Sequence, residues 1–102
     1  MPDAAEPGVR PPFANLIGGE WRPSISGQAY EKAGPWRPSE AIGAFPASAA
    51  EDVDAAVEAA AAAFPDWART PAAVRGALLT TAAETIEARA EQIAQDMTLE
   101  MG

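Results

Sequence analysis

The segment that most constrains the fold is an alanine-rich stretch at residues 51–64, in which the larger side chains recur at helical spacing. Val53, Val57, Ala60 and Phe64 follow one another at intervals of four, three and four residues, which places them on one face of a helix. Alanine has the highest helix propensity, and its small side chain lets a neighbouring element pack closely. The stretch therefore predicts an amphipathic helix that needs a partner surface.

The two ends of this helix are also predicted from the sequence. Ser48 and Glu51 have the spacing of a capping box, in which the serine accepts from the amide three residues on and the glutamate reaches back. Asp52 and Asp54 add negative charge where a helix N-terminus is partly positive, so we interpret these acids as helix-start residues rather than a metal cluster. Pro65 lacks an amide hydrogen and predicts that the helix stops there.

Further helical patterns follow. Thr70 and Pro71 predict the start of a second helix, with threonine as its N-cap and proline in its first turn. Either this helix continues toward the C-terminus or a break near Arg89 begins a third one, and we expect the break. Gly102 is predicted to cap the last helix. The apolar residues that define the two patterns are Val74, Leu78, Ala82 and Ile86, then Ala90, Ile93, Met97 and Met101.

The first half of the chain predicts strands and turns. Residues 1–12 are expected to form a flexible, proline-rich lead-in. Short extended runs at 15–17 and 20–22 flank Gly18-Gly19, which supplies the positive φ of a tight hairpin turn. Two more strands are expected at 28–33 and 42–45, on either side of a loop that begins at Gly34-Pro35. The predicted fold class is therefore α+β: N-terminal β-hairpins followed by two or three amphipathic helices.

Composition excludes several function classes. The chain has 15 acidic and 7 basic residues, a formal net charge of −8, and such a surface repels nucleic acid and anionic membranes. It has no cysteine and no histidine, so disulfides, thiolate and imidazole metal ligands and the commonest nucleophile and general base are missing. We therefore assign no catalytic or cofactor-binding residue. No targeting segment or membrane span is predicted, and the expected location is the cytoplasm.

Four strings, in order along residues 13–102, resemble those of the aldehyde dehydrogenase superfamily. The third string, which begins at Glu51, continues with Ala60, Ala63-Phe64 and Trp67, as in that family's first helix. The second string departs from the family pattern, because Gly34 stands where asparagine is usual. The strings are Asn15-Leu16-Ile17-Gly18-Gly19-Glu20-Trp21; Gly34-Pro35 with Ser39-Glu40-Ala41-Ile42-Gly43; Glu51-Asp52-Val53-Asp54-Ala55-Ala56-Val57; and Thr98-Leu99-Glu100-Met101-Gly102.

The resemblance implies a parent enzyme that oxidises an aldehyde to a carboxylic acid with NAD or NADP. Proteins of that family have a Rossmann-like NAD(P) domain, a catalytic domain with a cysteine nucleophile and a small oligomerisation domain, and a glutamate activates water. Residues 13–102 would be a truncated N-terminal part of such a protein, from the outer layer of its NAD(P)-binding domain. The expected partners are the remainder of its own catalytic chain and, for the parent, further copies in a homo-oligomer. The chain alone is expected to be inactive.

The resemblance also implies a monovalent cation site. Many proteins of the family bind Na⁺ or K⁺ through two backbone carbonyls before the second string and the acid of the fourth. Those positions here are Lys32, Ala33 and Glu100, and oxygen ligands suit a hard cation. The alternative for Glu100 is an ordinary solvated glutamate.

A different function class also fits the pattern. The chain could be a self-standing acidic, helical binding module without catalysis, which uses its alanine-rich helix as a partner surface.

Overall fold

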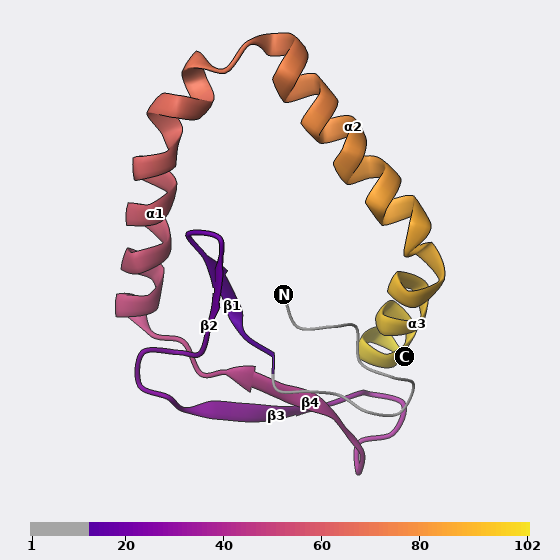
Figure 1. The fold of residues 1–102 in the computed structure, drawn as a ribbon. Coiled ribbons are helices and arrows are strands. Elements are labelled where there is room, and N and C mark those ends of the chain that lie inside the picture. The colour runs from indigo at the N-terminus through magenta and orange to yellow at the C-terminus, as the bar shows by residue number, and fades with distance from the viewer. Residues whose placement is uncertain (1–12) are drawn as a thin grey trace.

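The computed structural model describes residues 13–102, which form two β-hairpins followed by three helices (Figure 1). This order confirms the predicted α+β class. The flexible lead-in expected at residues 1–12 lies outside the described residues. The elements are β1 (Asn15–Ile17), β2 (Glu20–Arg22), β3 (Ala29–Ala33), β4 (Ala41–Pro46), α1 (Ala50–Arg69), α2 (Ala72–Ala88) and α3 (Ala90–Met101).

The first hairpin turns as the sequence predicts. β1 and β2 pair antiparallel, with Leu16 opposite Trp21, and the two residues between the strands are Gly18 and Gly19. Their φ angles of 61° and 80° lie in the left-handed region, which glycine adopts without steric cost. Ile17 at the end of β1 is the only hydrophobic side chain among residues 13–102 that is buried. The core of the described chain is therefore very small.

The second hairpin is held by aromatic side chains. β3 and β4 pair antiparallel with Tyr30 opposite Phe45, and the register shifts between Lys32 and Ala33. Phe13 joins this hairpin through a 2.8 Å hydrogen bond from its amide to the carbonyl of Ala44. The Phe13 ring stacks on Phe45 with centroids 4.7 Å apart. Gly43 allows this contact, because a Cβ there would lie 2.5 Å from a carbon of the Phe13 ring.

The capping box predicted at Ser48 and Glu51 is wrong by one residue. α1 begins at Ala50 after the N-cap Ala49, and Asp52 accepts the Ala49 amide hydrogen bond at 2.8 Å. The Ser48 hydroxyl instead accepts a 2.8 Å hydrogen bond from the side-chain amide of Asn15. Ser48 thus ties α1 to the first hairpin, and the buried Asp52 carboxylate replaces Glu51 as the acid that reaches back.

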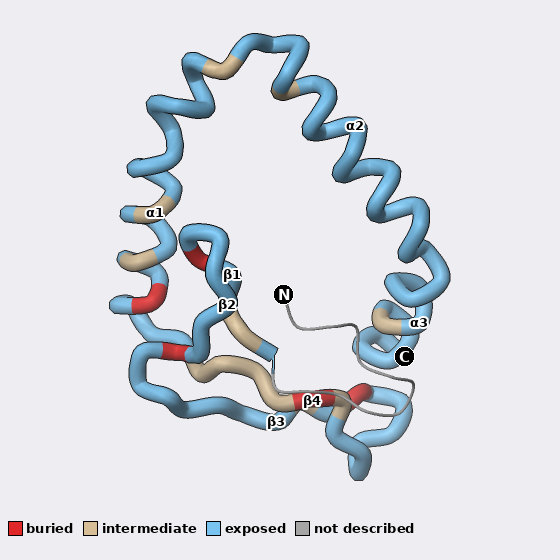
Figure 2. Tube along the Cα trace, viewed as in Figure 1, coloured by how far each residue is buried: buried red, intermediate tan, exposed pale blue. Residues whose placement is uncertain are grey.

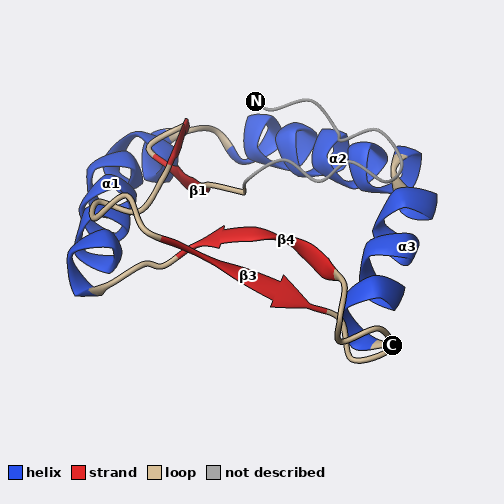
Figure 3. Ribbon diagram, turned by 90° about the horizontal axis from the view of Figure 1, so that it is seen from below, coloured by secondary structure: helices blue, strands red, loops and turns tan. Residues whose placement is uncertain are grey.

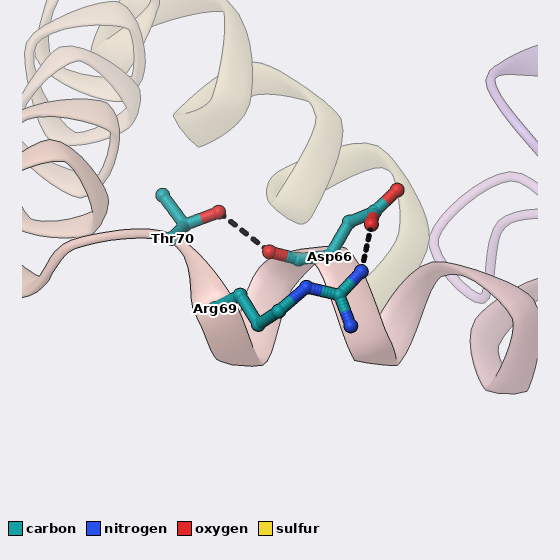
Figure 4. Close-up of polar contacts among 3 residues, drawn as sticks. All are labelled: Asp66, Arg69 and Thr70. Carbon is teal, nitrogen blue, oxygen red and sulfur yellow. Dashed lines mark hydrogen bonds and ion pairs between the residues drawn. The ribbon is translucent and has the colours of Figure 1, made fainter.

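The prediction that Pro65 ends the first helix is also wrong. α1 continues through Pro65 to Arg69, and its last turn carries polar contacts of Asp66, Arg69 and Thr70 (Figure 4). The Asp66 carboxylate accepts a 2.6 Å hydrogen bond from Arg69. The Asp66 carbonyl accepts both the amide and the hydroxyl of Thr70, at 3.0 and 2.8 Å.

Thr70 therefore closes α1 and is not the N-cap of the second helix. The sequence predicted Pro71 in the first turn of the second helix. α2 instead begins one residue later, at Ala72, and Pro71 is its N-cap residue. Thr70 has extended backbone angles (φ −64°, ψ 130°) because the ring of the following proline disfavours the helical region. The predicted break near Arg89 is confirmed, since that residue separates α2 from α3. Gly102 caps α3 with a φ of 85°, also as predicted.

The described chain is open rather than closely packed (Figure 2). Its radius of gyration is 16.6 Å, against about 13 Å for a compact domain of this length. It exposes 7818 Å², whereas a compact protein of this mass exposes about 5,400 Å². The predicted apolar faces around Val57, Phe64, Leu78 and Ile86 are more than half exposed. No part of the rest of the described chain covers them.

Candidate functional site

The three residues expected to bind a cation lie where the end of β3 meets the C-terminal end of α3 (Figure 3). The ammonium nitrogen of Lys32 lies 3.8 Å from a carboxylate oxygen of Glu100, and each side chain is almost half exposed. Ala33 follows at the point where the β3–β4 register shifts. The structure thus brings together residues 68 positions apart, and it pairs Glu100 with an ammonium group.

The backbones of these two ends approach each other closely. Gly34 is buried, and a Cβ added to it would collide with the carbonyl oxygen of Leu99. About one helical turn after Leu99, a Cβ added to Gly102 would lie 3.3 Å from the ring of Pro35. The glycine at position 34, where the family pattern has asparagine, is therefore the residue that lets α3 approach the β3–β4 loop this closely.

A cavity of about 70 Å³ adjoins Glu100. Its lining includes Asp96 and Glu100, one helical turn apart on α3, and the other lining residues are apolar. Asp96 also accepts a 3.1 Å hydrogen bond from Gln92. We did not predict the cavity, although the four-residue spacing of Asp96 and Glu100 indicates a shared helix face. Its lining residues are Phe13, Ile42, Phe45, Asp96, Leu99 and Glu100.

The side chains present limit what this site can bind. Within residues 13–102, no group of three or more histidine, cysteine, aspartate or glutamate side chains is placed to hold a metal ion. A cation here would therefore need backbone carbonyl oxygens beside the Glu100 carboxylate, as the sequence resemblance implies.

Within residues 13–102, the helices are all too short or too polar to span a bilayer.

Comparisons with known proteins agree with the motifs. The family model described as "Aldehyde dehydrogenase family" matches residues 21–102. An alpha-ketoglutarate semialdehyde dehydrogenase of Haloferax volcanii is 36% identical over 91 residues, which cover 89% of this chain and 19% of the relative. An acetaldehyde dehydrogenase of Pseudomonas aeruginosa is 38% identical over 93 residues, covering 91% and 18%. A vanillin dehydrogenase of Corynebacterium glutamicum is 41% identical over 88 residues, covering 86% and 18%.

The chain spans about a fifth of the length of these curated relatives. No solved structure gives a significant match.

Proposed function

The chain belongs to the aldehyde dehydrogenase family, and from this membership we propose that it is one part of a longer enzyme. That enzyme oxidises an aldehyde to a carboxylic acid with NAD or NADP. The observation that carries the proposal is the family match over residues 21–102. The three relatives are each named for an aldehyde, and these aldehydes differ in the rest of the molecule. The proposal therefore specifies the aldehyde group of the substrate and no other part of it.

The residues that do the chemistry belong to other parts of the enzyme. The chain has no cysteine to attack the aldehyde carbon. NAD or NADP would supply the hydride acceptor, and we assign no residue of this chain to its binding. The chain alone is therefore inactive in this proposal, and it contributes structure to a cytoplasmic, homo-oligomeric enzyme.

The test uses a hybrid protein, in which this chain replaces the matching segment of the Pseudomonas aeruginosa relative. Formation of reduced nicotinamide is followed with acetaldehyde and NAD or NADP, for the hybrid and for the 102-residue chain alone. We expect turnover by the hybrid and none by the chain. Turnover by the chain alone, or a folded hybrid without activity, contradicts the proposal. A binding module unrelated to catalysis would produce the second of these results.

We also propose that Glu100, with the carbonyls of Lys32 and Ala33, binds Na⁺ or K⁺. The proximity of Glu100 to Lys32, near the end of β3, supports this proposal, because the two side chains lie 3.8 Å apart. The Lys32 ammonium opposes it in part, because it already neutralises the same carboxylate at 3.8 Å. A cation would therefore have to displace this ammonium group or share the carboxylate with it.

Melting temperatures of the hybrid in NaCl, KCl and choline chloride at equal ionic strength test the cation. We expect stabilisation by Na⁺ or K⁺ over choline, and loss of that difference in Glu100→Gln but not in Glu87→Gln, an exposed acid on α2. Equal behaviour in the three salts would mean that salt only screens the Lys32–Glu100 pair.

A further inference from the structure

One face of α2 is apolar over a wide arc. At about 100° per residue, five apolar side chains of this helix fall within an arc of about 140°. The four larger ones are about half exposed or more. The acids Glu84 and Glu87 lie on the opposite side of the helix. The five residues, which we call the α2 face, are Val74, Leu78, Leu79, Ala82 and Ile86.

Arg75 lies within this arc, between Ala82 and Ile86 in the helical projection. It is partly buried, whereas the other residues of α2 are exposed. None of the ion pairs and side-chain hydrogen bonds formed among residues 13–102 includes its guanidinium group. By contrast, Arg22, Arg37 and Arg69 each pair with an acid within three residues. The α2 face thus presents a single cation that has no carboxylate partner in the described chain.

The other polar groups of α2 near this face are already satisfied. The hydroxyl of Thr85, which also lies in the arc, donates to the Thr81 carbonyl at 2.9 Å. Thr81, at the edge of the arc, donates in the same way to the Ala77 carbonyl at 3.1 Å. A surface that covers the α2 face would therefore need to supply one polar group only, an anion for Arg75.

The exposed area indicates how large that surface is. The chain exposes 7818 Å², about 2,400 Å² more than a compact protein of its mass. A second copy in an interface of standard size would cover about 800 Å² of it. The relatives continue for roughly four-fifths of their length outside the matched segment. A polypeptide of that size can cover the excess in full.

We propose that the α2 face packs against the rest of the longer enzyme, on an apolar surface that contains one buried carboxylate, and that this carboxylate binds Arg75. This inference rests on the proposed function, since it takes the occupant to be the remainder of the same enzyme. A guanidinium taken out of water without a partner is strongly disfavoured. A carboxylate can accept two parallel hydrogen bonds from the planar guanidinium group. The ion pair of Arg75 with this carboxylate then fixes the position of α2 on that surface, while the apolar residues around Arg75 exclude water.

The first test removes the charge in two settings. In the hybrid, Arg75→Met leaves the carboxylate of the occupant buried and unpaired, so we expect the melting temperature to fall by several degrees. Arg75→Lys should recover part of the loss. In the 102-residue chain alone, Arg75→Met should not reduce helical content, because no carboxylate is left behind. Arg89→Met, at an exposed arginine just after α2, is the matched control. If Arg75→Met is tolerated as well as Arg89→Met in the hybrid, the proposal is wrong.

The second test measures whether the face is covered. The chain has no cysteine, so single cysteines at Leu78 and Glu84 report on the two sides of α2, and mass spectrometry of the α2 peptide gives their alkylation rates. We expect Leu78→Cys to react on the order of tenfold more slowly in the hybrid than in the chain alone. Glu84→Cys should react at similar rates in both. Equal rates for Leu78→Cys in both settings overturn the proposal.

Two other outcomes also contradict it. A discrete dimer of the chain alone that protects Leu78→Cys would make a second copy the occupant. A hybrid without a cooperative melting transition would mean that this polypeptide is not a partner for the face. A hybrid that protects Leu78→Cys but does not oxidise aldehyde would contradict the proposed function only.

Discussion

The carboxylate of Asp52 accepts a 2.8 Å hydrogen bond from the amide of Ile25, 27 residues earlier in the chain. Its other oxygen accepts the amide of Ala49 at the same distance. Asp52 is only 5% exposed. One buried side chain thus caps α1 and fastens it to the loop that follows the first hairpin.

We expect Asp52→Ala to be the most damaging single substitution among the acids at the start of α1. It leaves two amide donors without their acceptor, at a cost of about 1–3 kcal/mol each if they stay buried. The melting temperature of the hybrid and the far-UV circular dichroism of the chain should both decrease. Asp54→Ala removes an exposed acid from the same turn and should change stability by less than about 0.5 kcal/mol. Equal effects of the two variants would mean that helix-dipole charge, rather than the two hydrogen bonds, is what Asp52 contributes.

Alanine is expected to have opposite effects at two glycines. Gly34→Ala places a Cβ against the carbonyl oxygen of Leu99 and should push α3 away from the β3–β4 loop. Gly76→Ala meets no atom within 4 Å on exposed α2, and it should stabilise that helix by about 0.5–1 kcal/mol. Hydrogen exchange of α3 amides in the hybrid, together with melting temperatures, measures both. Unchanged exchange in Gly34→Ala would contradict the close contact.

Local pattern predicted the elements well, and tertiary contacts decided the places where it failed. The Gly18-Gly19 turn, the break at Arg89 and the Gly102 cap depend on backbone chemistry within a few residues. The helix cap involves a distant residue: Asp52, which accepts the Ala49 amide in place of Glu51, also accepts the Ile25 amide, and a local motif contains no information on Ile25. Similarly, the resemblance located Lys32 and Glu100, but the Gly34–Leu99 contact that joins their elements needs coordinates.

Pro65 is a further residue that the local rule misjudged, and its replacement should strengthen α1. Proline in a helix interior removes one hydrogen bond and crowds the preceding turn, which costs about 3 kcal/mol. The last turn of α1 is nevertheless helical, and it contains the Asp66, Arg69 and Thr70 contacts. We expect Pro65→Ala to increase helical content and to raise the melting temperature. Pro71→Ala, at the boundary of α2, should have little effect. No gain in Pro65→Ala would mean that surrounding contacts require the geometry that the proline imposes.

The isolated chain is expected to behave as an incompletely packed protein, because its apolar residues have almost no core. Val57 and Phe64 on α1 are 61% and 66% exposed, whereas the side of α1 that faces the first hairpin carries Asp52 and small alanines. Such faces bind hydrophobic dyes and associate non-specifically. We expect 1-anilinonaphthalene-8-sulfonate fluorescence, polydispersity in light scattering and a broad thermal transition. Phe64→Ser should reduce dye binding and association, whereas Ala61→Ser, at an exposed position one turn earlier, should not. A monodisperse monomer with a sharp transition would instead indicate that residues 1–102 form a self-sufficient domain.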